Sequence, residues 1–406
     1  MRGVCFFVNI SCIFSCIVVG GEMFEVLIGQ SEDVLEKEAT EEVLSQIRIQ
    51  LGQRHPQAGI LLCSIEYDHG IILDIIHNEF SSIDLVGCTT DGELCSNLGF
   101  TDDSLVLILF VSDVVEIKSG SGFGISSDGT QAGEQAALQC VSKLHNKRGH
   151  EKFAIILADP ISAGISGVDV GIKKILGENF PVFGGVAAAH SKQRKTSQFI
   201  DNTVATDSVV LLLFAGDIHF SFGIKGGHSP LGLREAVGRV EKNTLYTIGQ
   251  RTAYEYFRHY IGDSDIFMNY CLAVFPDRSD DYYVLSAPKS DPEKGSVSLN
   301  GCVPDGAEVQ IGTADRNVIT KSCFESIQGA IDRYPGKKIS VALFFSCAGR
   351  KMIMGTKVVE EYATARRLLP SIPFAGFYCY GEFGPVQANS AFRFHGTTFV
   401  TLLIGE

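Results

Sequence analysis

The chain has 406 residues, of which 45% are hydrophobic and 20% charged, a balance that excludes a disordered protein and allows two or three domains. The formal net charge of −13 argues against a nucleic-acid partner, because an acidic surface repels phosphate backbones. The 12 cysteines include no C-x-x-C pair, so the sequence gives no support for a structural zinc site or a redox dithiol.

Residues 1–22 are expected to lie outside the fold. One arginine is followed by an apolar run, the pattern of a secretory signal or a marginal membrane anchor. The first strand-like pattern begins at Met23, which is an alternative start of translation. We therefore expect a cytoplasmic protein if translation starts at Met23, and otherwise one that is membrane-anchored or exported through residues 1–21.

One pattern occurs three times along the chain. Each copy predicts a buried strand, a helix, a short strand that ends at a glycine, and a final buried strand. In chain order the copies occupy 59–64, 71–76, 83–93 and 103–110; 153–159, 168–176, 181–190 and 207–214; and 339–347, 357–369, 373–382 and 397–404. We predict an α/β fold with mixed β-sheets and flanking helices, built from three repeated β-α-β-β units.

A different region separates the second and third copies. It predicts a helix at 250–261 and short strands near 282–285, 295–300 and 307–312. We expect a domain boundary near residue 240, after the glycine-rich run 226–230.

Several of these stretches resemble a known family. The motif GCTTDGE at 87–93, followed by a strand that begins with serine, resembles the N-terminal FIST domain. The motifs FSCAGR at 345–350 and PFAGFYCYGE at 373–382, with Phe394-His395 after them, resemble the C-terminal FIST domain. On this resemblance, residues 23–240 form a FIST N-type domain with two units, and residues 241–406 form a FIST C-type domain.

The resemblance implies a sensory module of signal transduction that binds a small ligand, such as an amino acid. The chain has no recognisable output domain, so the signal is expected to pass to a separate protein such as a histidine kinase. Some bacterial members look like haem-binding nitric oxide sensors, which leaves haem as an alternative ligand. An enzyme that uses Glu93 or Glu382 as acid or base ranks last, because no nucleophile–base pair is recognisable.

Two Gly-x4-Gly-Glu turns, at 87–93 and 376–382, supply most of the candidate ligand-binding residues. Open α/β sheets bind ligands at the carboxyl ends of their strands, and a carboxylate there can accept a ligand ammonium group. We therefore expect ligand contacts from the following side chains: Thr89, Thr90, Glu93, Tyr380 and Glu382. The competing interpretation is structural, with the glycines making turns and the glutamates capping a helix or pairing with a lysine.

The remaining candidates are a thiol, a guanidinium and two imidazoles. Arg350 can bind a ligand carboxylate with both arms of its fork, or form a structural ion pair. Cys347 is expected to line the site rather than act as a nucleophile. His190 is aligned with the glutamates of the other two turns, and it and His395 are the candidates for a haem ligand, against the alternative that both serve only the fold.

Overall fold

The computed structural model describes residues 23–146, 150–160, 164, 166–190, 195–262, 270–276 and 280–406. The predictions for residues 1–22 lie outside these residues. Within them, each helix is too short or too polar to cross a membrane.

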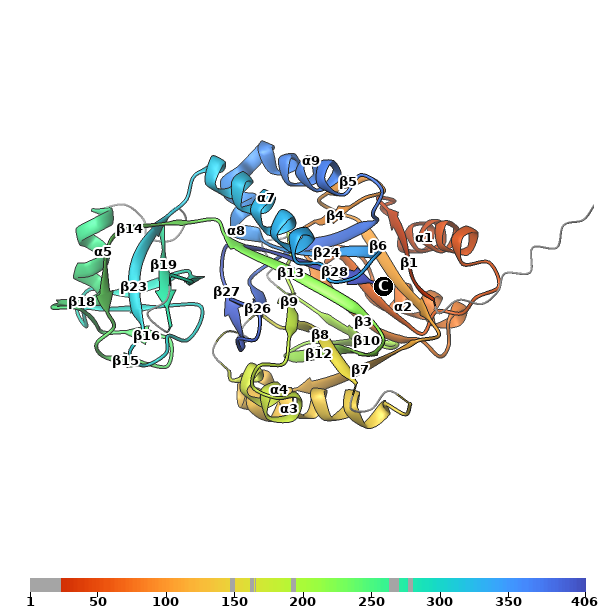
Figure 1. Ribbon diagram of the computed structural model, residues 1–406, viewed down its shortest axis with the longest axis horizontal. Helices are drawn as coiled ribbons and strands as arrows, with labels where there is room; N and C mark the ends of the chain where they lie inside the picture. The colour runs from red at the N-terminus through yellow and green to blue at the C-terminus, as the bar shows by residue number, and fades with distance from the viewer. Residues whose placement is uncertain are drawn as a thin grey trace, which may run out of the picture.

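Three six-stranded sheets form the body of the molecule (Figure 1). The first has the order β1 (Phe24–Ser31), β6 (Leu105–Ser112), β2 (Ala58–Ser64), β3 (Asp84–Thr90), β10 (Gln198–Ile200), β11 (Thr203–Ala205). The second has the order β7 (Val115–Phe123), β12 (Ser208–Gly216), β8 (Glu151–Ala158), β9 (Val182–Val186), β26 (Glu382–Pro385), β27 (Phe392–His395). The third has the order β13 (His219–Gly226), β28 (Thr398–Gly405), β24 (Ile339–Cys347), β25 (Phe374–Cys379), β4 (Glu93–Cys95), β5 (Gly99–Thr101).

The three sheets are connected in the same way. In each, the first two strands of one unit run parallel, and the final strand of that unit lies antiparallel to the first. A fourth strand, β1, β7 or β13, lies antiparallel to that final strand at the edge of each sheet. The remaining two strands come from a different unit: β4 and β5 join the third sheet, β10 and β11 the first, and β26 and β27 the second. The α/β class with mixed sheets is therefore confirmed, and the common wiring is what duplication of one unit predicts.

Helices cover the outer faces of the sheets, whereas the inner faces pack against one another (Figure 1). The largest hydrophobic cluster combines strands of all three sheets, with Ile60, Ile155 and Leu343 among its buried members. The outer helices are α1 (Glu36–Leu51), α2 (His69–Glu79), α3 (Ile125–Lys143), α4 (Val168–Leu176), α7 (Arg316–Asp332) and α9 (Val359–Leu368). Burial of apolar strand faces on both sides explains why these strands appear in the sequence as continuous hydrophobic runs.

Strand β7 shows how closely the outer helices pack against the sheets. A Cβ atom added to Gly122 would lie 1.9 Å from the carbonyl oxygen of Ala132 on α3. Gly120, where the same atom would lie 2.2 Å from the carbonyl oxygen of Ala136, also allows this close helix–sheet packing, and β7 pairs with β12 without a register shift.

The region between the second and third units forms a separate lobe, on the left in Figure 1. Its strands are β14 (Ser229–Ala236), β15 (Val240–Glu241), β16 (Thr244–Leu245), β17 (Thr247–Ile248), β18 (Arg251–Thr252), β19 (Tyr270–Phe275), β20 (Tyr283–Leu285), β21 (Lys289–Asp291), β22 (Ser296–Ser298) and β23 (Glu308–Thr313). Helix α5 (Ala253–Ile261) begins at a capping box, in which Thr252 and Glu255 satisfy each other's backbone N–H groups. The predicted helix and the three predicted strands of this region are all present.

Candidate functional site

The carboxyl ends of β3, β9 and β25 meet at one point, where the three sheets come together. Three backbone hydrogen bonds connect them: Asp91 N to Tyr378 O (2.9 Å), Ala188 N to Thr89 O (2.9 Å), and Tyr380 N to Val186 O (3.4 Å). We call residues 89–91, 186–188 and 378–380 the strand-end ring. Because the donors and the acceptors occupy corresponding positions in the three units, each unit contributes equally to the ring.

A group of charged side chains lies beside the ring, and we call it the strand-end cluster: Asp91, Asp102, His190 and Lys351. The Lys351 ammonium donates to the carbonyl oxygen of Asp91 (2.7 Å) and forms ion pairs with Asp91 Oδ1 (3.3 Å) and Asp102 Oδ1 (2.6 Å). The Nδ1 atom of His190 lies 3.2 Å from Asp91 Oδ1 and 3.4 Å from Lys351 Nζ. Three units thus supply one cluster that holds charges of both signs.

The cluster is only partly open to solvent. The side chains of Lys351 and Asp91 are 13% and 12% exposed, whereas those of Asp102 and His190 are 47% and 50% exposed. Burial raises the pKa of Asp91, although Lys351 and His190 act in the opposite direction. The inner half of the cluster is therefore fixed, and the outer half is accessible to a small molecule.

A buried network positions Lys351. It lies on α8 (Ala348–Met354), whose Arg350 is fully buried and pairs with Glu361 of α9 at 2.6 Å. Arg350 also donates to Ser322 Oγ and to the carbonyl oxygen of Ile319, both on α7. Helix α8 is thereby attached to two outer helices, which fixes the base of the Lys351 side chain.

Arg350 was expected to bind either a ligand carboxylate or a structural partner. Its guanidinium group is engaged by Glu361, Ser322 and Ile319, and its side chain has no exposed surface. A ligand carboxylate would have to displace Glu361, so this geometry favours the structural alternative.

Of the residues predicted in the first turn, Thr89 and Thr90 belong to the ring, and Glu93 lies beneath it. Thr89 Oγ1 accepts a hydrogen bond from Ser197 N, Thr90 donates to Glu93 Oε1, and Ser104 donates to Glu93 Oε2 at 2.7 Å. Glu93 is fully buried, and burial raises its pKa to about 8. The structure therefore brings Thr90 and Glu93 together, but it places them beneath the cluster rather than in it.

The residues predicted in the third unit separate into two groups. Glu382 is fully buried, accepts hydrogen bonds from Thr398 N (2.9 Å) and Thr398 Oγ1 (2.6 Å), and lies within hydrogen-bond reach of the Cys347 thiol. Burial raises the pKa of Glu382 to about 7. Tyr380 instead belongs to the ring, and its hydroxyl donates to the carbonyl oxygen of Ala189 (2.5 Å), next to His190.

The alignment of His190 with the two glutamates was wrong. Glu93 pairs with Phe377 and Glu382 with Gly185, and the residue that pairs in the same register in the second unit is Gln198, opposite Cys88. His190 lies on an additional segment between β9 and β10, which a comparison of sequence spacing alone does not reveal.

The second haem candidate, His395, is buried at the end of β27. Its Nε2 atom lies 2.8 Å from the carbonyl oxygen of Gly384, and burial lowers its pKa to about 4. Binding iron through Nε2 would require this contact to break, so the geometry favours a role in the fold.

Sequence reasoning missed three members of the strand-end cluster. Asp91 lies inside the GCTTDGE motif and Lys351 directly follows FSCAGR, so both were adjacent to residues that were named. Their spacing carries no signal of the contact, because 260 positions separate them. Asp102 precedes the final strand of the first unit, where an aspartate is an ordinary turn residue.

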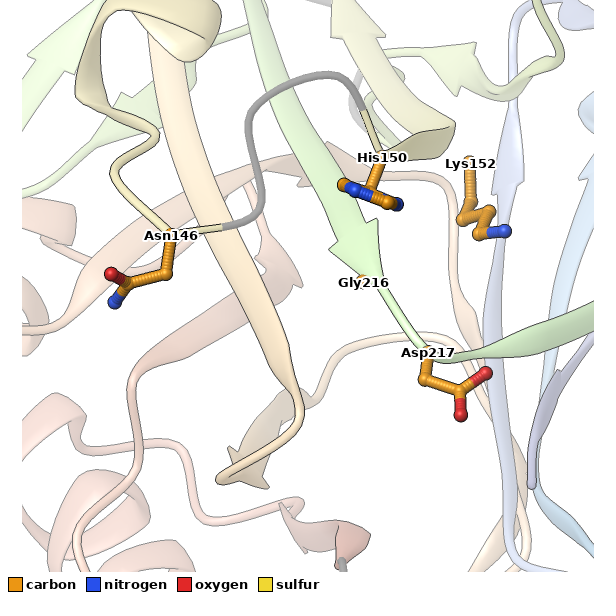
Figure 2. A pocket seen from close by; sticks show the side chains of 5 residues that line it. All are labelled: Asn146, His150, Lys152, Gly216 and Asp217. Atoms are coloured by element: carbon orange, nitrogen blue, oxygen red, sulfur yellow. The ribbon is translucent and has the colours of Figure 1, made fainter.

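A surface pocket of about 320 Å³ lies elsewhere, at the start of β8 and the end of β12. It is lined by Asn146, His150, Lys152, Gly216 and Asp217. Figure 2 shows that these side chains point in different directions. The pocket lies at the opposite end of the sheet from the ring, and we do not assign it a function.

Comparisons with known proteins agree with the sequence motifs. The model of the FIST N domain matches residues 57–251, and the model of the FIST C domain matches residues 253–385. An uncharacterized protein of Mycobacterium bovis is 26% identical over 230 residues, and one of Mycobacterium tuberculosis is 25% identical over 239 residues. The matches cover 53% of this chain and 58% and 59% of those proteins, so the chain spans somewhat more than half the length of the relatives that it matches.

Among solved structures, a cyanuric acid hydrolase from A. caulinodans aligns over 94% of this chain and 99% of its own. The TM-score is 0.39 and the sequence identity is 7%. A likeness of this size carries no argument about the activity of the chain.

Proposed function

Because the chain belongs to the FIST family, whose domains are associated with sensing in signal transduction, we propose that it binds a small ligand at the strand-end cluster and regulates a separate signalling protein. The observation that carries this proposal is the meeting of Asp91, His190 and Lys351, one from each unit, at a partly exposed point. A ligand held there contacts all three units at once. Binding can therefore alter how the units pack, which is what a sensor requires.

The charges of the cluster support an amino acid or a related zwitterion as the ligand. Lys351 provides a cation for a carboxylate, and the exposed Asp102 provides an acceptor for an ammonium group. Groups whose pKa is shifted by burial and by charged partners are concentrated at functional sites, and Asp91 is such a group. The proposal is one of binding without turnover, with a histidine kinase as the class of partner.

A thermal-shift screen against the amino acids, followed by calorimetric titration of those that stabilise the protein, tests the proposal. We expect Lys351→Met to weaken binding about tenfold or more, because a hydrogen bond to a charged group contributes roughly 1.5–3 kcal/mol. Lys174→Met is the matched control, since Lys174 is 62% exposed and forms a surface ion pair with Glu134.

Three outcomes separate the alternatives. Equal affinity of the ligand for the wild type and for Lys351→Met would show that the ligand does not bind at this cluster. A haem absorption band that is lost in His190→Ala, with no response to amino acids, would favour a gas sensor. Chemical conversion of a bound ligand would favour an enzyme.

A further inference from the structure

Three side chains occupy corresponding places directly under the strand-end ring. Glu93, Gln198 and Glu382 are the first residues of β4, β10 and β26, the strands through which each unit enters a sheet of another unit. Each pairs with the residue that follows the turn glycine on the neighbouring strand: Phe377, Cys88 and Gly185. The fold therefore holds the same position three times, twice with a carboxyl group and once with an amide.

One end of each of these side chains has the same environment. Its oxygen accepts a hydrogen bond from a hydroxyl group at the start of the final strand of the same unit. The donors are Ser104 for Glu93 (2.7 Å), Ser208 for Gln198 (2.8 Å) and Thr398 for Glu382 (2.6 Å).

The surroundings of the other end of the side chain differ between the glutamates and the glutamine. The two carboxyl groups face a hydrogen-bonding side chain three residues after the turn glycine, Thr90 in the first unit and Cys379 in the third. The corresponding residue of the second unit is Ala187, and there the Nε2 atom of Gln198 has no hydrogen-bond partner among the described residues. A side-chain oxygen or sulfur thus lies beside each carboxyl group and can accept a hydrogen bond from its O–H, whereas the corresponding position of the second unit is an alanine, which offers no such acceptor.

Neither carboxyl group has a cation to balance a negative charge. Among the ion pairs of the described residues, none includes Glu93 or Glu382, although both side chains are fully buried. Glu361, which is equally buried, pairs with Arg350 at 2.6 Å. An isolated buried carboxylate is costly, whereas a neutral carboxylic acid resembles the amide of glutamine in shape and hydrogen bonding.

We infer that Glu93 and Glu382 serve the fold as protonated, uncharged equivalents of Gln198, and that their ionisation at alkaline pH loosens the strand-end ring. Both are directly connected to it. Glu93 contacts Thr90, which belongs to the ring, and Glu382 follows Gly381, whose carbonyl oxygen accepts a hydrogen bond from Val186 N. The inference is a pH-sensitive switch under the proposed site, and it does not depend on which ligand binds there.

The neighbouring titratable groups determine the direction of the effect. Around Glu93 these are Asp103, Lys351 and Tyr67, together with the thiols of Cys63, Cys88 and Cys95. Asp103 opposes ionisation of Glu93, and Lys351 favours it at longer range. Around Glu382 they are the thiols of Cys347 and Cys379, with His395 opposite on β27.

The sign of the pH dependence follows from the raised pKa values. Burial raises the pKa of Glu93 to about 8 and that of Glu382 to about 7, from an ordinary value of 4.5. Between pH 4.5 and these values the folded protein binds more protons than the unfolded chain. The stability that these groups contribute is therefore present below pH 4.5 and is lost as the pH rises through 7 and 8.

The experiment compares the full chain with Glu93→Gln, Glu382→Gln and the double variant, with Glu178→Gln, an exposed position, as the control. The melting temperature of each is measured from pH 5 to pH 9. We expect the double variant to gain roughly 4 °C or more relative to the wild type between these limits, and the control to gain nothing. Infrared spectra of the wild type at pH 6 should show a protonated-carboxyl band that the double variant lacks.

Hydrogen exchange provides the readout for the ring. Amides of residues 87–92 and 376–381, corrected for the intrinsic effect of pH on exchange, should lose protection at pH 9 in the wild type and retain it in the double variant. A melting-temperature difference that is constant with pH, or a wild-type spectrum without the protonated-carboxyl band at pH 6, would overturn the inference. If the double variant does not fold, the wild-type spectrum and Glu382→Gln alone still decide between these outcomes.

Discussion

The third unit contains two fully buried glutamates in opposite electrostatic environments. Glu361 accepts hydrogen bonds from Arg350, Ser346 and Tyr378, so its charge is balanced by a cation and distributed over several donors. Within the part of the chain that the structure describes, the hydrogen-bonding groups at the carboxyl group of Glu382 are Thr398 and two thiols, and none of them is a cation. Burial alone therefore does not determine whether a carboxyl group is charged, because the groups that face it also shift its pKa.

The difference separates two tasks. The Arg350–Glu361 pair connects helices on the outside of the sheets, where α7, α8 and α9 need fixed relative positions. The uncharged positions lie inside the sheets, at strand ends that three units share. The ion pair lies where it fixes the relative positions of helices. Uncharged side chains lie where a change of charge would disturb the strand-end ring.

The largest expected effect comes from removing the cation of the pair. Arg350→Met leaves Glu361 buried without a balancing charge, which costs about 3–5 kcal/mol in the free energy of unfolding. Urea denaturation at pH 7 measures it. The double variant Arg350→Met/Glu361→Met should recover part of that loss, and a single variant as stable as the wild type would show that the pair does not hold the helices.

A carboxyl group in place of the Gln198 amide should make the stability of the second unit depend on pH. The Nε2 atom of Gln198 is buried without a hydrogen-bond partner among the described residues, so in Gln198→Glu an ionised oxygen at that end would have none either. We expect a loss of about 2–3 kcal/mol at pH 9 and little change at pH 5, because stability is lost as the pH rises through the raised pKa of the new carboxyl group. Gln53→Glu, at an exposed position, is the control. A loss that is equal at both pH values would show that shape rather than charge decides this position.

Weakening the ion pair without removing its charges should have a smaller effect. Tyr378→Phe deletes the hydroxyl that donates to Glu361 Oε2 at 2.6 Å. Because a hydrogen bond to a charged group contributes roughly 1.5–3 kcal/mol, we expect a loss of about 2 kcal/mol in urea denaturation. Tyr334→Phe removes a hydroxyl contact to the carbonyl oxygen of Lys338 at the surface and should cost less. Equal losses in the two variants would argue against a special role for the charge of Glu361.

The smallest effect on stability is expected at the strand-end cluster itself. Lys351 pairs with Asp102, whose side chain is 47% exposed, and solvent screens such a pair. Asp102→Asn should change the free energy of unfolding by less than about 1 kcal/mol while weakening ligand binding. A large loss of stability would place Asp102 among the structural residues and not at a binding site.

Much of the fold could be predicted from the sequence because its main signals are local. The run 103–110 corresponds to β6 (Leu105–Ser112), and the apolar stretch 339–347 corresponds to β24 (Ile339–Cys347). Strands buried on both faces leave hydrophobic runs that need no knowledge of their partners. The small errors lie at the ends of elements, as for α9, which begins at Val359 rather than near Lys357.

The candidate site was less predictable because its contacts are non-local. Nothing near Arg350 in the sequence indicates that Glu361 of α9 lies against it, and nothing near Asp91 indicates Lys351. The register that makes Gln198 the counterpart of Glu93 depends on which sheet each hairpin joins, and that choice leaves no local pattern. The residues named from the motifs were therefore close to the site, whereas their roles required the three-dimensional pairing.

The exchange of hairpins among the sheets has a consequence for how the protein can be divided. A fragment that ends at residue 251 would contain β4 and β5 but lack β25, the strand on which they lie, and its second sheet would lack β26 and β27. Each unit completes a sheet of another, in a closed cycle, so the boundary between the two family models is not a boundary between parts that fold alone. The three units are expected to unfold in a single cooperative transition, and an N-terminal fragment should be unstable until the remainder of the chain is supplied.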